Sequence, residues 1–291
     1  MSVSDNFKTF CNNLRMSDDT VDSIAYRYKR ITKQLNKCYW NSESETSHSL
    51  YVGSYGRGTE IHTSDIDMLF WLPYEDYMRF DNYIGNGQSA LLQEVKNCIQ
   101  NTYKTYMRAD GQVVKVDFTD KISFEIVPCF VNTDDSFTYP DTNSGGSWRT
   151  TNPKPEIAEM ISANNLWNKN LKRLCRMARA WKQVWDVPMG GLLIDTLAYK
   201  FLKAWANKDK SFIYYDWMSR DFFKFLCEQS ESQSYWLSPG ANQFVWRKGK
   251  FEYKAKRCYN ISLEAIQNES DGYHYTSKTK WREIYGTKFP S

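Results

Sequence analysis

Two aspartates, Asp65 and Asp67, are separated by one residue and lead directly into an apolar run at 68–72. In a β-strand, side chains two residues apart point to the same face, so both carboxylates project together while Ile66 and Met68 face the other way into a core. Adjacent carboxylates repel each other unless a cation lies between them. Oxygen ligands suit Mg2+, which also takes substrate phosphates as ligands. The pattern therefore predicts a Mg2+ site that binds a phosphate compound, with Mn2+ as the alternative metal.

A glycine–serine turn, Gly53-Ser54, precedes the aspartates and follows a short apolar run at 49–52. Glycine allows backbone N–H groups to come close to a phosphate. Taken singly, a Gly-Ser pair is usually only a turn, and an Asp-x-Asp pair is usually a solvated strand face or a cap. Their order and spacing together favour a site for a nucleoside triphosphate and its metal. Arg57 lies between the two motifs, either reaching a phosphate or exposed to solvent.

A third acid, Glu125, lies between Phe124 and Ile126 in an apolar segment at 122–130, which reads as the strand returning from 112–118. A carboxylate is costly to bury without a charge partner, so a metal shared with Asp65 and Asp67 explains its presence. The alternative is that Glu125 faces solvent on an edge strand. Asp117 is the next acid that fits the third position.

Together, Gly53-Ser54, Asp65-Ile66-Asp67 and Glu125 resemble the motif of the DNA polymerase β-like nucleotidyltransferases. The wider segments VGSYGRGTEIHTSDIDMLFWLP and FEIVPCF resemble the bacterial CD-NTases, the cGAS/DncV-like enzymes of the SMODS family, and in particular their clade E-like branch. The resemblance implies an enzyme that makes a cyclic oligonucleotide, most often a cyclic dinucleotide, from NTPs. It also implies anti-phage signalling of the CBASS type, in which a separate effector protein binds the product. In the family the third acid is often Asp, and Glu125 keeps the charge.

The resemblance also assigns roles to individual residues. Asp65, Asp67 and Glu125 become the metal ligands and catalytic residues, and Gly53 and Ser54 hold the phosphates. Arg179 stands two residues before a tryptophan, where related synthases carry a lysine that contacts phosphate. Lys172 and Arg176 lie on the same predicted helix face as Arg179; they either face solvent or grip the triphosphate.

Base recognition is predicted from aromatic and amide side chains. Tyr139 and Trp148 lie in a segment at 132–155 rich in turn formers, where they either stack on a base or fix the loop to the protein. The branch that the chain resembles includes enzymes that accept UTP, in which an Asn at the start of the helical lobe reads a uracil edge. That Asn is expected among the three candidates Asn152, Asn164 and Asn165, with Asn165 preferred, although Asn is also a common helix cap.

The elements that position these residues are expected to form an α+β fold. Residues 1–152 are predicted to hold two N-terminal helices, within 3–39, and a nucleotidyltransferase core of mixed sheet and helices, with one helix at 89–106. Residues 153–291 are predicted to form a helical lobe that includes helices at 192–205 and 216–229. The periodicity of residues 243–291 is too weak to assign elements.

Composition limits the function classes. The chain has 291 residues, a net charge of +4, three His and seven Cys without CxxC spacing. These counts argue against a zinc site and a disulfide framework, and favour a reducing, cytoplasmic location. The positive charge is too weak to argue for nucleic-acid binding by itself. The sequence shows no zinc finger and no long basic surface, which disfavours an obligatory nucleic-acid activator, and no membrane span is expected. The alternative function is a template-independent nucleotidyltransferase acting on RNA or on a small-molecule acceptor.

Overall fold

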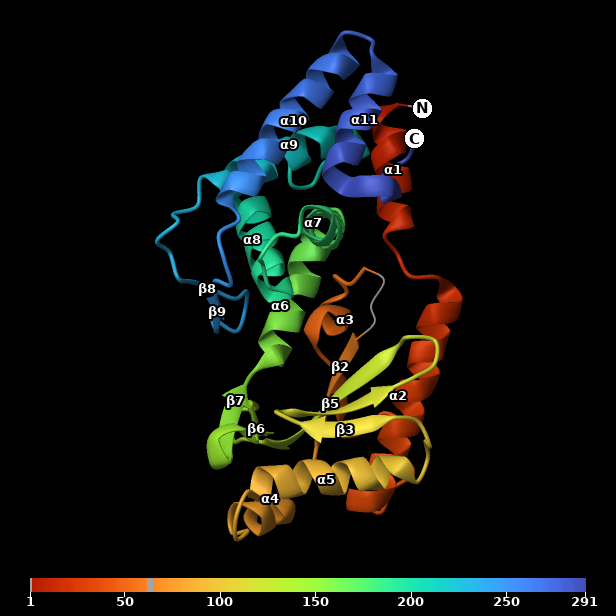
Figure 1. Cartoon of the computed structure of the whole chain (residues 1–291), viewed down its shortest axis with the longest axis vertical. Coiled ribbons are helices and arrows are strands. Elements are labelled where there is room, and N and C mark those ends of the chain that lie inside the picture. Colours follow the sequence, from red (N-terminus) through yellow and green to blue (C-terminus); the bar gives the residue numbers. More distant parts are fainter. Residues whose placement is uncertain (1, 62–64) are drawn as a thin grey trace. The chain divides into compact units, whose positions relative to one another are not determined.

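The strand that carries Asp65 and Asp67, β2 (Asp65–Trp71), lies in a mixed seven-stranded sheet (Figure 1). The structure is a computed structural model that describes residues 2–61 and 65–291. The main strand order is β1-β2-β5-β4-β3, in which β2 and β5 are parallel and the other pairs are antiparallel. The remaining strands of this path are β1 (Ser49–Tyr51), β3 (Met107–Asp110), β4 (Val113–Asp117) and β5 (Ser123–Val131).

Contacts divide the chain into two compact units. Unit 1 comprises residues 1–15, 57–62 and 154–291, and unit 2 comprises residues 16–56 and 63–153. The division by contacts thus assigns the first helix and residues 57–61 to the C-terminal unit, whereas the sequence-based domains divide the chain once, at residue 152. Those predicted domains stay a prediction.

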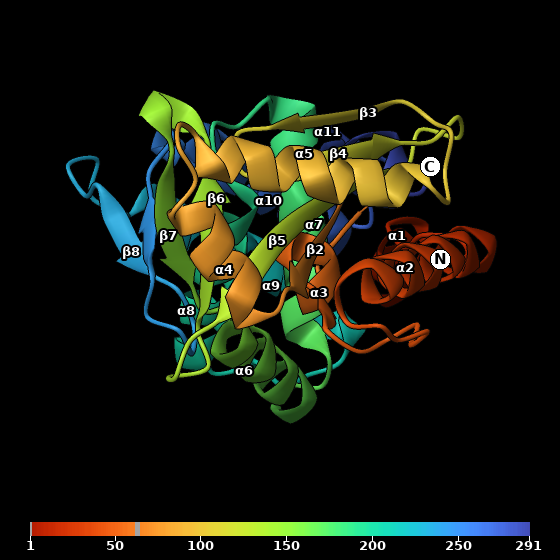
Figure 2. The ribbon, with the colours of Figure 1, turned by 90° about the horizontal axis from the view of Figure 1, so that it is seen from below.

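The sheet of unit 2 is covered by helices whose apolar side chains pack with it in one core. They are α2 (Asp18–Tyr39), α4 (Tyr74–Asp81) and α5 (Gly87–Gln100), and α4 and α5 lie side by side (Figure 2). Ser17 caps α2 by accepting the backbone N–H of Thr20, as its position predicts. The apolar stripes of α2 and α5 are fully buried, at Ile24, Ile31, Leu35, Leu91, Leu92, Val95 and Ile99. Each such side chain contributes about 1.5–3 kcal/mol of burial free energy, which holds the sheet and its acids in place.

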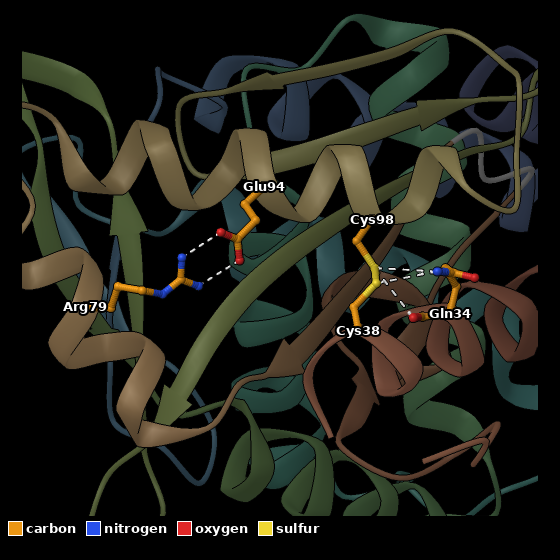
Figure 3. The surroundings of a disulfide bond; sticks show 5 residues. All are labelled: Gln34, Cys38, Arg79, Glu94 and Cys98. Carbon is orange, nitrogen blue, oxygen red and sulfur yellow. Dashed lines mark hydrogen bonds and ion pairs between the residues drawn. A yellow bond between two sulfur atoms is a disulfide. The ribbon is translucent and has the colours of Figure 1, made fainter. Parts of the chain in front are cut away.

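A disulfide joins α2 to α5, between Cys38 and Cys98 (Figure 3). The expectation of an all-reduced chain is therefore wrong for this pair. The two cysteines are 60 residues apart in sequence, and only the packing of α2 on α5 brings them together. Arg79 of α4 forms a two-pronged ion pair with Glu94 of α5, at 2.7 and 2.8 Å. The three helices are thus linked laterally as well as through the core.

The segment after β5 forms a hairpin instead of the predicted loop. It consists of β6 (Phe137–Asp141), a short 3-10 turn at Asn143–Gly145 and β7 (Ser147–Thr151). β6 continues the sheet by pairing with the end of β5. Some turn formers of this segment, such as Asn143 and Gly145, lie in the hairpin turn, whereas Pro140 lies on β6; Tyr139 and Trp148 lie on the two strands.

Unit 1 is mainly helical, as predicted for the C-terminal half. Its helices are α1 (Val3–Asn13), α6 (Pro153–Leu166), α7 (Asn170–Trp185), α8 (Gly191–Ala204), α9 (Tyr215–Cys227), α10 (Glu252–Ser270) and α11 (His274–Tyr285). Short 3-10 turns lie at Phe212–Tyr214 and Gly286–Lys288, and β8 (Tyr235–Leu237) pairs with β9 (Phe244–Trp246). α10 packs against α9 and α11 (Figure 1). None of the helices in the described ranges is long and apolar enough to cross a membrane.

Candidate active site

The three predicted acids share one face of the sheet. β2 and β5 are parallel neighbours in a register that pairs Asp67 with Glu125, and Asp65 lies two residues from Asp67 on the same strand. Ile66 and Met68 are fully buried on the opposite face, as the strand alternation predicts. Asp65 is about half exposed and Glu125 is 29% exposed. The alternative of Glu125 on an edge strand is wrong, because β5 lies between β2 and β4.

A lysine that the sequence analysis did not single out completes this cluster. Lys115 of β4 is the cross-strand partner of Glu125. Its Nζ lies 2.9 Å from Asp65 Oδ1 and 3.1 Å from Glu125 Oε1. The hydrogen bond to Asp65 is the largest effect that raises the pKa of Lys115, and the bond to Glu125 adds to it. Lys115 could have been found from its strand, because it lies between the buried Val114 and Val116, as Glu125 lies between Phe124 and Ile126, so that alternation directs both charged side chains to the other face.

The backbone conformation and the close neighbours of position 53 require a glycine there. It ends the connection from β1, has a φ of +61°, and opens the short helix α3 (Gly53–Arg57). A Cβ at this position would lie 1.8 Å from Asp67 Oδ2, so any other residue would collide with the carboxylate. The Gly53-Ser54 turn thus passes directly beside Asp67. The turn and the paired aspartates, which lie 14 residues apart from Gly53 to Asp67, form one site in unit 2.

The donor chemistry of this cluster fits a hard divalent cation. Asp65, Asp67 and Glu125 offer carboxylate oxygens on one sheet face, and the glycine leaves space beside Asp67 that a Cβ would fill. Across the described part of the chain, no three acidic, His or Cys side chains stand arranged as a metal cluster. The ammonium group of Lys115 bridges Asp65 and Glu125 instead, and it supplies the positive charge that two close carboxylates need.

Asp117, the alternative third acid, is engaged elsewhere. Its Oδ1 accepts a hydrogen bond of 2.6 Å from the Ser123 hydroxyl, its cross-strand partner. Asp117 therefore lies next to the cluster but not in it.

The predicted phosphate-binding arginine, Arg179, lies in a buried ion-pair network of unit 1. Its guanidinium pairs with both oxygens of Asp195 and donates to the backbone carbonyl of Gly191. Arg57 enters the same network, 2.8 Å from Asp195 and 2.8 Å from Glu156. The solvent-exposed alternative for Arg57 is wrong, because charge partners 99 and 138 residues away bury it. The contact of Arg179 with phosphate stays a prediction.

Lys172 and Arg176 project from the same helix as Arg179 but differ from it in burial. Both are half-buried. Arg176 donates to the carbonyls of Gly58 and Glu60, at 2.8 and 3.0 Å, and pairs with the Glu60 carboxylate at 3.1 Å. Neither predicted alternative, a solvated face or a triphosphate grip, accounts for this attachment to residues 58–60.

The aromatic candidates lie on the two strands of the hairpin. Trp148 donates its ring N–H to Asp81 at 2.9 Å and packs against Tyr77 and Phe130. Of the two alternatives for Trp148, fixing the segment to the protein is therefore the one observed. Tyr139 is half-buried on β6 opposite Arg149, and its stacking role stays a prediction.

The three candidate asparagines have different surroundings. Asn165 is exposed and accepts a hydrogen bond from Lys169. Asn164 is buried and accepts the backbone N–H of Lys172 at 3.1 Å. Asn152 has a buried side-chain oxygen that makes no hydrogen bond within the described residues. The choice among them stays a prediction.

Comparison with known proteins identifies the family. Residues 1–164, more than half of the chain, match the family model described as the Second Messenger Oligonucleotide or Dinucleotide Synthetase domain, SMODS. The chain belongs to the SMODS family. This match contains the turn, the paired aspartates and the third acid, so the family resemblance drawn from those residues is confirmed.

A curated relative of this SMODS chain is a probable cyclic nucleotide synthase of Bacillus cereus (strain VD146). It is 24% identical over 181 residues, which cover 58% of this chain and 52% of the relative. The matched region thus spans about half the length of that relative.

Solved structures of CD-NTases share the fold of the SMODS chain at low sequence identity. The Escherichia coli MS115-1 CdnC in complex with HORMA-deltaN has a TM-score of 0.71 at 12% identity, covering 99% of this chain and 98% of that chain. The Bradyrhizobium diazoefficiens CdnG in complex with GTP has a TM-score of 0.68 at 10% identity, covering 97% and 94%. The predicted α+β fold, a polymerase β-like core with a helical C-terminal lobe, is therefore confirmed.

Proposed function

We propose that this SMODS chain is a metal-dependent nucleotidyltransferase that joins NTPs into a cyclic oligonucleotide, most often a cyclic dinucleotide. The observation that carries the proposal is the register of β2 and β5, which places Glu125 beside Asp67. Asp65 and the Gly53-Ser54 turn adjoin the same pair. Family membership and the fold shared with cyclic dinucleotide synthases support the same chemistry.

The residues of unit 2 divide the reaction between them. Backbone N–H groups at Gly53-Ser54 and the Ser54 hydroxyl bind the phosphates of the donor NTP. Glu125 accepts the proton of the attacking ribose hydroxyl, whose oxygen bonds to the α-phosphorus as the bond to the leaving pyrophosphate breaks. A second transfer in the reverse direction closes the ring. Tyr139 is proposed as a stacking surface for a base. In unit 1, Arg179 is proposed separately as a phosphate contact, on the family resemblance alone.

Asp65, Asp67 and Glu125 would hold Mg2+, or Mn2+ in its place. The metal supplies charge stabilisation at the phosphates and at the leaving group. A divalent cation competes with the Lys115 ammonium for Asp65 and Glu125. This competition is a property of the chain's own residues and is testable without turnover.

The substrate and the setting of the reaction are part of the proposal. Related CdnC and CdnG structures are described with ATP and GTP, which supports NTPs as substrates. We include UTP among them, with Asn165 as the residue that reads the uracil edge, because an amide offers both a donor and an acceptor. The setting proposed is the cytoplasm, in CBASS-type anti-phage signalling, with an effector protein that binds the product and without an obligatory nucleic-acid activator.

Product analysis tests this function. The purified chain is incubated with labelled NTPs and Mg2+, treated with phosphatase, and separated by chromatography. A labelled product that resists phosphatase is expected, because a closed ring has no terminal phosphate. A product that grows only when RNA or a small-molecule acceptor is added would instead support the alternative, a template-independent transferase.

A further inference from the structure

A cavity of about 310 Å³ in unit 1 is lined by positive charge. It lies where α1, the end of α6, the start of α7 and the turn at Phe212 meet. Six of its lining side chains are cationic: Lys8, Arg15, Lys169, Lys172, Arg173 and Arg176. No acidic residue is among the described lining residues, whereas the net charge of the whole chain is only +4. Of the residues considered above, Lys172 and Arg176, for which a triphosphate contact was one alternative, and Asn164, a candidate for reading the base, line this cavity, whereas the three acids, Gly53, Ser54, Arg179, Tyr139 and Asn165 are not among its lining residues.

These cations are poorly compensated by the protein. Within the described ranges, only Arg176 among the six forms an ion pair, with Glu60. Lys172 is half-buried, and burial followed by the charge of Arg176 lowers its pKa. The other cations with bonds use neutral partners: Arg173 donates to a backbone carbonyl and lies over the Phe212 ring. Cations that lie close together and are partly shielded from water repel one another, which costs free energy. A bound anion would offset this repulsion.

From this geometry we propose that the cavity binds a short chain of phosphate groups. The ligand is either a free inorganic polyphosphate or the phosphate chain of a nucleotide. Several cations converging on one cavity suit several adjacent phosphate oxygens. Asn12 and Asn164 add polar groups to the wall, and Phe212 adds an aromatic face. The volume is that of a small-molecule pocket, whereas a nucleic-acid duplex requires an extended track of phosphate contacts.

The site is attached to the segment that follows α3. Lys172 Nζ lies so close to Gly58 that a Cβ there would be 2.7 Å from it. Arg176 holds the carbonyls of Gly58 and Glu60. Both side chains therefore line the cavity and lie against residues 58–60, to which Arg176 is hydrogen-bonded. We expect a bound ligand to stabilise this segment. Residues 58–60 follow the proposed phosphate-binding turn, Gly53-Ser54, in the sequence.

The experiment uses the full chain with the double substitution Asp65→Asn and Asp67→Asn, in EDTA, so that the proposed metal site does not contribute. Tripolyphosphate is titrated by calorimetry, and the thermal midpoint is measured alongside. One equivalent is expected to bind and to raise the midpoint. Adding Lys172→Gln should weaken binding at least tenfold, Lys172→Arg should restore most of it, and Lys200→Gln on the exposed face of α8 should leave it unchanged.

Two further titrations identify the source of the phosphate. Tighter binding of ATP than of tripolyphosphate would assign the site to a nucleotide, and the reverse would assign it to a free polyphosphate. Equal affinity in the Lys172→Gln and Lys200→Gln variants would overturn the site. Binding of a 20-base-pair RNA duplex without binding of tripolyphosphate would overturn it as well, in favour of a nucleic-acid surface. Because metal and both aspartates are absent, either result is independent of the proposed synthase activity.

Discussion

Glu125 owes its surroundings to strand pairing and not to its sequence neighbours. It is surrounded in sequence by Phe124 and Ile126, both fully buried, yet it lies on the opposite face beside Asp67. On the neighbouring strand β4, the residue paired with Glu125 is Lys115.

Replacing Glu125 by Gln removes the proton acceptor while keeping the shape. We expect a loss of about 10²–10³-fold in kcat, the scale of one strong electrostatic group in a transition state, measured as the initial rate of product formation. Asp117→Asn is the matched control, because Asp117 lies on the next strand and is bonded to Ser123. A slow Asp117→Asn variant with a normal Glu125→Gln variant would transfer the role to Asp117.

Lys115→Gln tests the competition between lysine and metal. Without the ammonium, the carboxylates of Asp65 and Glu125 repel each other, so the thermal midpoint in EDTA should fall below that of the wild type. Mg2+ should then raise the midpoint of the variant more than that of the wild type, because the ion no longer displaces Lys115. The same Mg2+ increment in both proteins would show that the metal does not bind between these acids.

Strand alternation and turn chemistry were sufficient to predict the positions of some candidate site residues and not of others. Asp65, Asp67 and Gly53 follow from short-range spacing, because an i, i+2 pair and a positive-φ turn are local properties. Arg57 could not be placed, because its partners Glu156 and Asp195 are distant in sequence. Long-range charge pairing leaves no periodic signal in the chain.

At the scale of elements, the network around Asp195 joins α7, α8, the start of α6 and residue 57 within unit 1. Asp195 and Thr196 are fully buried, and Asp195 accepts from Arg57, Thr59 and Arg179. Removing one partner of a buried pair leaves the other charges uncompensated.

Asp195→Asn should therefore destabilise unit 1 by about 3–5 kcal/mol, the usual cost of breaking a buried ion pair. The free energy of unfolding in urea is the measurement. Glu231→Gln is the control, because its partner Lys250 and the glutamate itself are largely exposed, and it should leave stability unchanged. Equal stability of Asp195→Asn and the wild type would refute a structural role for the network.

The same network makes the free energy of unfolding depend on pH. Burial alone would raise the pKa of Asp195, but the charges of Arg179 and Arg57 outweigh it and hold the pKa at about 2, below the ordinary value of 3.8. A depressed pKa adds stability above the unfolded pKa and loses it as pH falls through the folded one. Wild-type stability should thus decline between about pH 4 and pH 2, and the Asp195→Asn variant should lack this component.

Helices with long apolar side chains at regular spacing could be predicted from the sequence. Helices that bury small side chains, and short strands that contain turn residues, could not. α2 and α5 bury Ile and Leu stripes, which give a clear 3.6-residue period. α10 buries Ala255, Cys258 and Ala265, whose small side chains give a weak one. The sequence predicts a loop where the β6–β7 hairpin lies, because its short strands carry turn residues such as Pro140.

At the scale of the whole molecule, the proposed substrates include UTP. NTPs supplied singly and in pairs should give a product whenever UTP is present with a second NTP or alone, and Asn165→Ser should shift incorporation toward purines, because it loses the paired donor and acceptor. Nucleoside analysis of the purified product is the measurement. A product made only from ATP and GTP, with UTP unused, would contradict the proposed base preference but not the nucleotidyl transfer.

The central claim is that one cluster, Asp65 with Asp67 and Glu125, performs nucleotidyl transfer. The most direct measurement is pyrophosphate release from NTPs in Mg2+, compared between the wild-type chain and the Asp65→Asn, Asp67→Asn double variant, with circular dichroism to verify the fold. Pyrophosphate release coupled to product formation is expected from the wild type, and no release is expected from the folded double variant. Wild-type rates of release from that variant would show that the reaction takes place elsewhere.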